Sequence, residues 1–279
     1  GYKVTYLPVD ADGQVSLEEL KKAITAETAL VSIQHANSEV GTVQPVAEIG
    51  AICRERGIIF HTDAVVTAGL LPLNVKQFNI DALTLSANQF YGPLGAGALY
   101  VRKGIRLKPQ IEGGIQENGR RAGTENVAAI VGMGVAAAIA AQEKHIWAEK
   151  LTVLQDKLIN GLLKAIPNSR LNGHPTNRLP DNVNIGIEFI EGESMLILLD
   201  MAGVAASSGS ACTSRALKAS HVLKAMGVPH EKIHGSLLFS LGKQNTEADI
   251  SYVIKSLPPI VERLRAMSPL VQSNLKKGA

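Results

Sequence analysis

The stretch Asp81–Val101, DALTLSANQFYGPLGAGALYV, decides the fold class of the first half of the chain. Its two apolar runs, DALTLSA and GAGALYV, predict strands on either side of a glycine-rich turn. The polar residues Ser86, Asn88 and Gln89 lie at the end of the first strand, where an open α/β sheet places its chemistry. Asn88 and Gln89 carry amides, which neither titrate nor act as nucleophiles, so the cluster needs an explanation.

Apolar strands and amphipathic helices alternate on the amino-terminal side of this stretch. The predicted strands are KVTYLPV (3–9), ALVSIQH (29–35) and GIIFHTDA (57–64), and the predicted helices are SLEELKKAITA (16–26) and VAEIGAICRERG (46–57). Ser16 and Glu19 form a capping-box pattern at the start of the first helix. This alternation predicts an α/β fold with a mainly parallel or mixed sheet covered by helices on both faces.

The carboxyl-terminal half predicts a second, smaller α/β domain. A glycine-rich polar loop (111–126) precedes a long helix from about residue 127 to 166. Short strands (182–189, 204–211 and 235–241) then alternate with helices (193–201, 220–227 and a last one capped at Thr246). We therefore place the domain boundary at 126/127, with a large domain over 1–126 and the long helix and small domain over 127–279.

Composition limits the classes of protein to which the chain can belong. Of 279 residues, 46% are hydrophobic and 19% charged, as in an ordinary globular protein, and the net charge of +3 is too diffuse to indicate nucleic-acid binding. Two cysteines fit a reducing, cytoplasmic compartment. We find no signal peptide and no apolar run of transmembrane length, so no membrane association is expected. Because the chain opens on Gly1 in what reads as mid-fold, we expect a fragment, or a fold completed by something else.

Two side chains are candidates for chemistry. Asp63 ends an apolar strand and is expected to be partly buried, either as a helix cap or salt-bridge partner or as the carboxylate that keeps a cofactor's ring nitrogen protonated. Cys212 lies in the small, polar stretch SSGSACTSR, where an inert thiol and a reactive one are about equally expected. We interpret Cys53, on a helix face, as a packing residue. The seven histidines are scattered without metal-site spacing, so no metal is expected, and His61 reads as structural.

Several longer motifs resemble the cysteine desulfurases of the NifS/IscS type, in the class V branch of fold-type I enzymes that use pyridoxal phosphate (PLP). They are HANSEVGTVQPVAEIG, GIIFHTDA, LSANQFYGPLGAGALYVRKG, GRRAGTENVAAIVGMG, LNGHPTNRLPDNVNI, EGESMLILLD and SSGSACTS. The resemblance runs almost from Gly1 to about Leu270. It implies an incomplete PLP-transferase large domain followed by the small domain.

The resemblance also implies roles for matching residues and a set of partners. Cys212 corresponds to the cysteine that carries the persulfide, Asp63 to the partner of the PLP pyridinium, and Ser86 and Thr124, the latter from a neighbouring subunit, to phosphate ligands. Family members are homodimers that release alanine from cysteine and pass sulfur to iron–sulfur scaffolds or tRNA-modifying partners. A homodimer, or a heterodimer with a longer desulfurase, is therefore expected.

Five positions depart from the family pattern at the implied PLP site. Asn88 and Gln89 stand where the family has histidine and the Schiff-base lysine, and a carboxamide cannot form an imine. Ser38 replaces a ring-stacking asparagine, Val66 a glutamine that bonds the ring hydroxyl, and Leu238 the arginine that clamps the substrate carboxylate. The family's amino-terminal segment, with its phosphate-binding turn, also has no counterpart.

These departures affect one site, while the hydrophobic pattern, caps and turns are intact. The favoured hypothesis is a desulfurase-like protein whose PLP chemistry is reduced or lost and which keeps Cys212 as a sulfur relay or serves as a binding partner. One alternative is an active desulfurase completed by another chain that supplies the missing segment. A second alternative is a truncated remnant that folds poorly, because missing strands leave an unpaired sheet edge.

Overall fold

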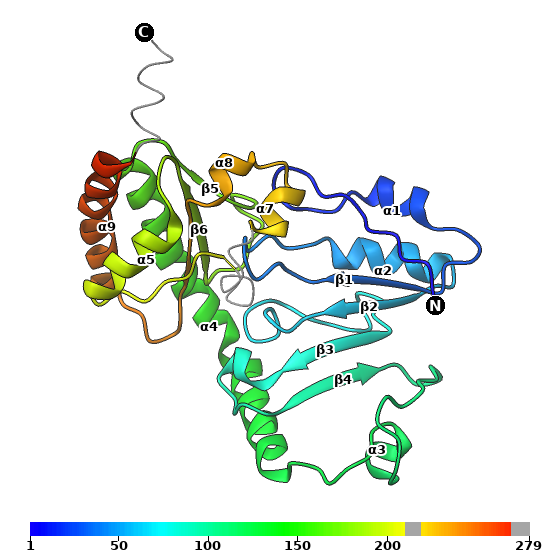
Figure 1. The fold of residues 1–279 in the computed structure, drawn as a ribbon. Helices are drawn as coiled ribbons and strands as arrows, with labels where there is room; N and C mark the ends of the chain where they lie inside the picture. The colour runs from blue at the N-terminus through cyan, green and yellow to red at the C-terminus, as the bar shows by residue number, and fades with distance from the viewer. Residues whose placement is uncertain (210–218, 269–279) are drawn as a thin grey trace. The chain divides into compact units, whose positions relative to one another are not determined.

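The computed structural model describes residues 1–209 and 219–268 and divides the chain into two compact units (Figure 1). The first, here called the four-stranded unit, comprises Ile24–Ala36 and Gln44–His145. The second, here called the three-stranded unit, comprises Gly1–Ala23, Asn37–Val43 and Ile146–Ala279. The contacts of the short segment Asn37–Val43 therefore group it with the carboxyl-terminal half of the chain.

The four-stranded unit contains a mixed sheet in the order β1-β2-β3-β4. Strands β1 (Leu30–Gln34), β2 (Ile59–Asp63) and β3 (Ala82–Ser86) are parallel, and β4 (Gly97–Val101) returns antiparallel to β3. The helical segments of this unit are α2 (Val46–Glu55), the 3₁₀ turn η1 (Ala87–Phe90), α3 (Gln116–Gly119) and the first part of α4 (Val127–Ala165). The predicted α/β class with a mainly parallel sheet is confirmed.

The two faces of this sheet differ in exposure. Val31, Phe60 and Leu83 are buried, and α2 contributes further buried side chains on its packed side. The strand neighbours that point the other way include Leu30 and Leu99, which are 54% and 52% exposed. Because alternate side chains of a strand point to opposite faces, one face of the sheet is packed and the other carries exposed apolar groups.

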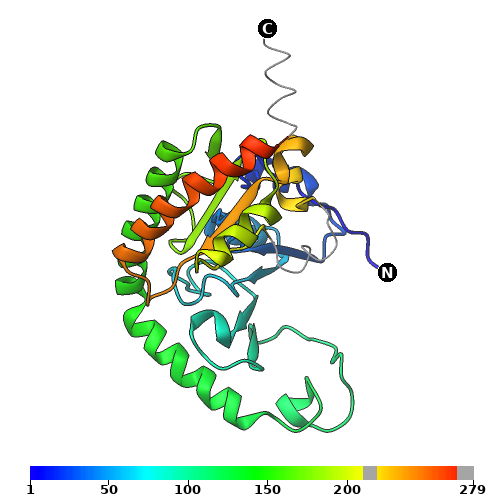
Figure 2. The same ribbon diagram turned by 60° about the vertical axis from the view of Figure 1, so that its left-hand side comes forward.

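The three-stranded unit contains an antiparallel sheet in the order β5-β6-β7. Its strands are β5 (Ser169–Leu171), β6 (Asn182–Ile187) and β7 (Ser236–Ser240). Its helices are α1 (Leu17–Ala23), the second part of α4, α5 (Gly192–Met201), α7 (His221–Ala225), α8 (His230–Ile233) and α9 (Glu247–Met267). Figure 2 shows α9 running beside the carboxyl-terminal turns of α4 along this sheet.

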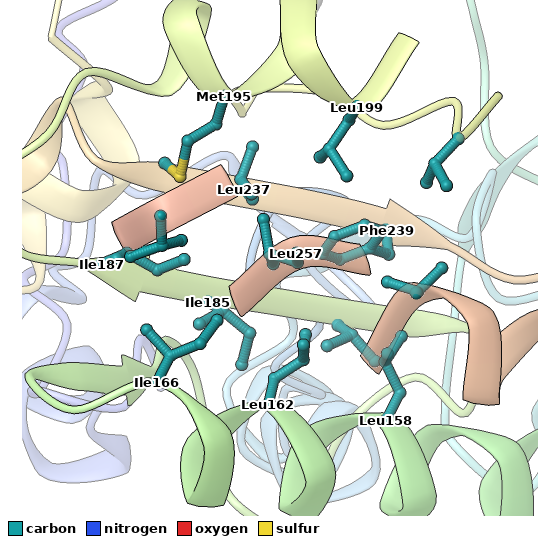
Figure 3. Packing of buried hydrophobic residues seen from close by; sticks show 14 of the residues in the cluster. Leu158, Leu162, Ile166, Ile185, Ile187, Met195, Leu199, Leu237, Phe239 and Leu257 are labelled. Atoms are coloured by element: carbon teal, nitrogen blue, oxygen red, sulfur yellow. The ribbon is translucent and has the colours of Figure 1, made fainter. Parts of the chain in front are cut away.

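The core of the three-stranded unit lies between the sheet and its three long helices. Leu158 and Leu162 of α4, Met195 of α5 and Leu257 of α9 pack with Ile185 of β6, all fully buried (Figure 3). The helix pattern that places leucines three and four residues apart puts these side chains on one stripe. The opposite, polar side of β6 is available for hydrogen bonding.

Two predicted strands are not strands in the structure. The segment at residues 3–9 makes only an isolated bridge from Val9 to Val15, and its Tyr2, Val4 and Tyr6 are exposed. In the segment predicted at 204–211, Ser207 forms one bridge to Leu238, and residues from 210 on lie outside the described part. Alternation of apolar residues therefore misled the prediction, because a strand forms only where a neighbouring strand accepts its hydrogen bonds.

The predicted helix starts are confirmed. Thr246 caps α9 in a capping box: its side chain accepts from the backbone of Asp249, whose carboxylate accepts from the backbone of Thr246. Helix α4 is, among the described residues, the one helix long and apolar enough to be a candidate membrane span, contrary to expectation. The first half of α4 is apolar and rich in alanine and glycine, and its second half contributes to the core of the three-stranded unit. Only the length and composition of α4 suggest a membrane span.

Candidate functional site

Asp63 and Ser86 lie at the same edge of the four-stranded sheet. Asp63 is the last residue of β2 and pairs with Thr84 of β3, two residues before Ser86. Parallel strands end on the same side, so the sequence order alone places these groups together. The prediction that Asp63 is partly buried is wrong, since its side chain is exposed. Its Oδ1 accepts a hydrogen bond of 2.9 Å from the backbone of Val65, which caps the turn after β2.

A row of hydrogen bonds crosses the sheet beside Asp63. The ring of His61 bonds through Nδ1 to the hydroxyl of Ser32 on β1 and through Nε2 to the hydroxyl of Thr84 on β3, both at 2.8 Å. Burial lowers the pKa of His61, and the nearby charge of Asp63 opposes that shift. His61 thus joins three strands through its side chain, as the structural interpretation of the sequence expected.

A second histidine, which the sequence did not single out, fixes the end of β1. His35 is 4% exposed, its Nδ1 lies 3.0 Å from the hydroxyl of Thr67, and burial lowers its pKa to about 4. Its backbone N–H donates to the carbonyl oxygen of Asp63 at 2.8 Å. His35 is therefore neutral near pH 7 and helps to place the residue at the end of β2.

The polar cluster after β3 forms the one-turn helix η1. The Ser86 hydroxyl donates a 2.5 Å hydrogen bond to Oδ1 of Asn88, and the side chains of Asn88 and Gln89 are exposed. Tyr91 ends the turn in the left-handed conformation. Thr124 is exposed in the loop that leads into α4. The cluster therefore presents hydroxyl and amide groups to solvent and no amine.

The lysines nearest to Gln89 in sequence flank the other end of β3. Lys76 precedes that strand, and Lys103 follows β4, whose Val101 pairs with Ala82 at the amino end of β3. Ser86, next to η1, is at the carboxyl end, roughly 13 Å away along a five-residue strand. Asp63 and Ser86 suit the polar ends of PLP, but neither lysine replaces an amine at position 89. Position 89 therefore offers no amine for covalent attachment of PLP.

In the three-stranded unit, Leu238 is buried, with 8% of its surface exposed, and pairs with Asn184 of β6. Its backbone exchanges two hydrogen bonds with Ser207. An isobutyl side chain cannot pair with a substrate carboxylate at this position. Ser38 is exposed in the segment Asn37–Val43. Cys212 lies outside the described residues.

A buried arginine holds the segment Asn37–Val43 in the three-stranded unit. Arg178 donates to the carbonyl oxygens of Asn172, His174 and Val40 and to both the carbonyl and Oδ1 of Asn182, at 3.1 to 3.3 Å. Burial lowers its pKa to about 10. The sequence analysis did not identify Arg178 as a buried residue with several hydrogen-bond partners. Its only signal was an arginine four residues before a strand that begins on a polar residue.

The amides of β6 add to this attachment. Asn182 Nδ2 donates to the backbone carbonyls of Ser38 and Glu39, and Asn184 Nδ2 donates to that of Glu39 at 2.9 Å. The alternation of Asn182 and Asn184 along β6 thus places both amides on the face that receives the loop. Among the described residues, no group of three histidine, cysteine or acidic side chains is arranged to hold a metal ion.

Comparison with known proteins agrees with this architecture. Residues 1–253 match the aminotransferase class-V family. The chain is 56% identical over 270 residues to the cysteine desulfurase IscS of Methanosarcina thermophila, covering 97% of this chain and 67% of that protein. It is 51% identical over 278 residues to the IscS of Clostridium botulinum strain Hall, covering 99% of this chain and 70% of that protein.

The solved structures that resemble it include a NifS-like protein, with a TM-score of 0.87 and 37% identity over 95% of this chain and 69% of that one. A second is the NifS-like protein of Rickettsia africae, with a TM-score of 0.84 and 34% identity over 92% of this chain and 69% of the other. The fold and the edge site define a protein of the class-V aminotransferase type. Within it, the chain belongs to the cysteine desulfurase family of the NifS/IscS type.

Proposed function

We propose that this chain acts in sulfur transfer for iron–sulfur cluster assembly without catalysing PLP-dependent release of sulfur from cysteine. The observation that carries the proposal is the exposed amide of Gln89 at the carboxyl end of β3, with Lys76 and Lys103 at the far end of that strand. The buried, apolar Leu238 supports it, because substrate cysteine would lose an ion pair there. In this proposal Cys212 is the sulfur-carrying thiol.

Noncovalent PLP binding remains compatible with the residues present. Asp63 would face the ring nitrogen, and Ser86, with Thr124 of a second subunit, would contact the phosphate. Bound PLP would supply an electron sink for chemistry at the α-carbon of an amino acid. The residues of this chain would bind and orient the ring, but position 89 carries a carboxamide and offers no amine to attach it.

The test is a PLP titration of the purified chain followed by borohydride reduction and intact mass, with alanine release from cysteine measured in parallel. We expect no absorbance band near 400–430 nm (roughly the range of a protein-bound aldimine), no reduced adduct and no alanine. The variant Gln89→Lys should gain both the band and an adduct at position 89. The matched control Asn88→Lys places the same amine one residue away and should gain neither. Alanine release by the unaltered chain would contradict the proposal.

The second candidate function is an active desulfurase formed with another chain. The exposed apolar side chains of Leu30, Ile59 and Leu99 on the open sheet face favour it, because a partner segment would bury them. The chain spans about two thirds of the length of the relatives it matches, so a longer desulfurase is the expected partner. Recovery of alanine release on mixing with such a desulfurase that keeps its Schiff-base lysine but has its persulfide cysteine replaced would support this candidate, because only this chain would then supply the thiol.

We further propose a dimer in the cytoplasm, with an iron–sulfur scaffold or another thiol as sulfur acceptor. The first half of α4 carries exposed apolar groups at Val127, Val131 and Val135, a stripe that a second subunit would cover. Sedimentation at several concentrations tests the dimer. The same sample tests the remaining alternative, a poorly folding remnant, because a soluble chain that unfolds cooperatively excludes it.

A further inference from the structure

One pair of histidines has the spacing of a metal site, contrary to the expectation that all seven are scattered. Residues 230–234 read HEKIH, which is the spacing H-E-x-x-H. Residues four apart on a helix lie on the same face, so His230 and His234 are placed to bind one ion together. The imidazole nitrogen is a ligand that suits zinc and similar divalent transition metals.

The structure brings the two rings together. Helix α8 is a single turn, and His234 continues it with right-handed helical dihedral angles. The ring centroids of His230 and His234 lie 5.1 Å apart, and the ring planes are inclined by 64°. A zinc–nitrogen bond of about 2.0 Å puts each ring centroid roughly 3 Å from the ion, so two rings at a tetrahedral angle have centroids about 5 Å apart. The observed separation agrees with that value.

The two imidazoles contact each other and are otherwise available to an ion. Neither ring makes a hydrogen bond or an ion pair with residues 1–209 or 219–268. His230 is exposed and His234 is half-buried, so the pair is open to solvent. The alternative interpretation is an edge-to-face contact between two surface histidines, which needs no ion. Titration with a metal ion distinguishes the two interpretations.

The helix that carries the pair is fixed to the three-stranded unit. Ile233 is 3% exposed and belongs to a buried cluster with Val40 and Leu223. The carbonyl oxygen of His234 accepts a hydrogen bond of 2.8 Å from the backbone N–H of Gly192. Helix α8 contacts both α7 and β6 (Figure 1). Two ligands on a turn held in this way lose little conformational entropy when they bind an ion.

The charges next to the pair favour a cation. Lys232, the lysine between the two histidines, forms an ion pair with Glu188, with 2.6 Å between Nζ and Oε1. Residues two apart on a helix do not face each other, so this ammonium group lies away from the rings. Glu231 is exposed and adjoins His230, so its carboxylate adds negative charge beside the pair.

We propose that His230 and His234 bind a divalent transition-metal ion of the zinc type, with water in the remaining coordination positions. Among residues 1–209 and 219–268, no third histidine, cysteine or acidic side chain completes the site. A catalytic zinc centre uses three protein ligands, so the pair supports ion binding and not a hydrolytic reaction. The inference does not depend on the proposed sulfur transfer, because neither histidine has a part in it.

The first experiment is a calorimetric titration of the full chain, without a histidine tag, with Zn²⁺ at pH 7.5. His230→Ala and His234→Ala should each weaken binding about tenfold or more. His230 is exposed, so its variant should fold even if His234→Ala does not. The matched control His145→Ala removes an exposed histidine from α4 and should bind Zn²⁺ as the unaltered chain does. Mg²⁺, which prefers oxygen ligands, should not compete.

The second experiment measures each histidine separately. Diethyl pyrocarbonate modifies imidazoles that hold no ion, and trypsin cleavage after Lys232 puts His230 and His234 on different peptides. Zn²⁺ should slow the modification of both rings and leave that of His145 unchanged. Protection of neither ring by Zn²⁺, or an affinity for Zn²⁺ that is unchanged in both alanine variants, would overturn the inference.

Discussion

Removal of the Arg178 side chain should destabilise the three-stranded unit by several kilocalories per mole. The guanidinium makes five hydrogen bonds, of which one shares the carbonyl of Asn182 with the side chain of Gln155. Arg178→Met leaves about four buried acceptors without a donor, at about 1 kcal/mol each, and recovers part of the cost of burying a cation. We therefore expect a loss of about 3 kcal/mol in the free energy of unfolding.

The assay is urea unfolding followed by the fluorescence of Trp147, the single tryptophan, which lies in the same unit. Arg178→Lys keeps the charge but not the planar fork, and should lose less than Arg178→Met. Arg263→Met removes an exposed arginine from α9 and should change the free energy by less than about 0.5 kcal/mol. A loss below about 1 kcal/mol for Arg178→Met would refute the view that Arg178 holds the segment Asn37–Val43 in place.

Three further predictions follow from burial. The pKa of His35 is 6.5 in the unfolded chain and about 4 in the folded one, so about 3 kcal/mol of stability should be lost as pH falls from 6.5 to 4. Thermal melts of His35→Asn should not show this fall of stability with pH. An unchanged fall in the variant would contradict the prediction. Folding raises the pKa of Glu39, so its ionisation lowers the stability of the folded chain as pH rises above 4.5. Glu39→Gln should have a higher melting temperature than the unaltered chain at pH 7 and the same one at pH 4. A lower melting temperature of the variant at pH 7 would count against this. Leu257→Ala empties a fully buried position in the core and should cost about 2–5 kcal/mol in urea unfolding, whereas a cost under about 1 kcal/mol would mean that the site collapses.

Local sequence signals determined the secondary structure wherever the signal was complete within the element itself. Two helix starts could be predicted from pairs of residues three apart, Thr246 with Asp249 and Ser16 with Glu19. In such a pair a side chain accepts a hydrogen bond from a backbone N–H that has no partner within the helix. The segment at 3–9 has equally good alternation and forms no strand, because among the described residues it is paired only through the isolated bridge from Val9 to Val15. The alternation is therefore necessary for a strand but not sufficient.

The edge site could also be anticipated from sequence. Asp63 and Ser86 each end an apolar run, and parallel strands bring such ends to one side of the sheet. The sequence alone also shows that position 89 carries an amide in place of an amine. The exposure of Asp63 could not be anticipated, because exposure at a sheet edge depends on which elements cover that edge.

Only the tertiary structure showed the importance of Arg178 and Glu39. Arg178 has several partners nearby in sequence, but its bond to Val40, and the bond from Asn182 to Glu39, join residues more than a hundred positions apart. Periodicity and capping report contacts within about four residues, whereas these contacts exist only after β6 and the segment Asn37–Val43 meet. The sequence by itself therefore determined most of the helices and strands, the family, and the departures from the family pattern at the PLP site. The fold decided which charged side chains are buried, and hence which of them respond to pH and hold distant segments of the chain together.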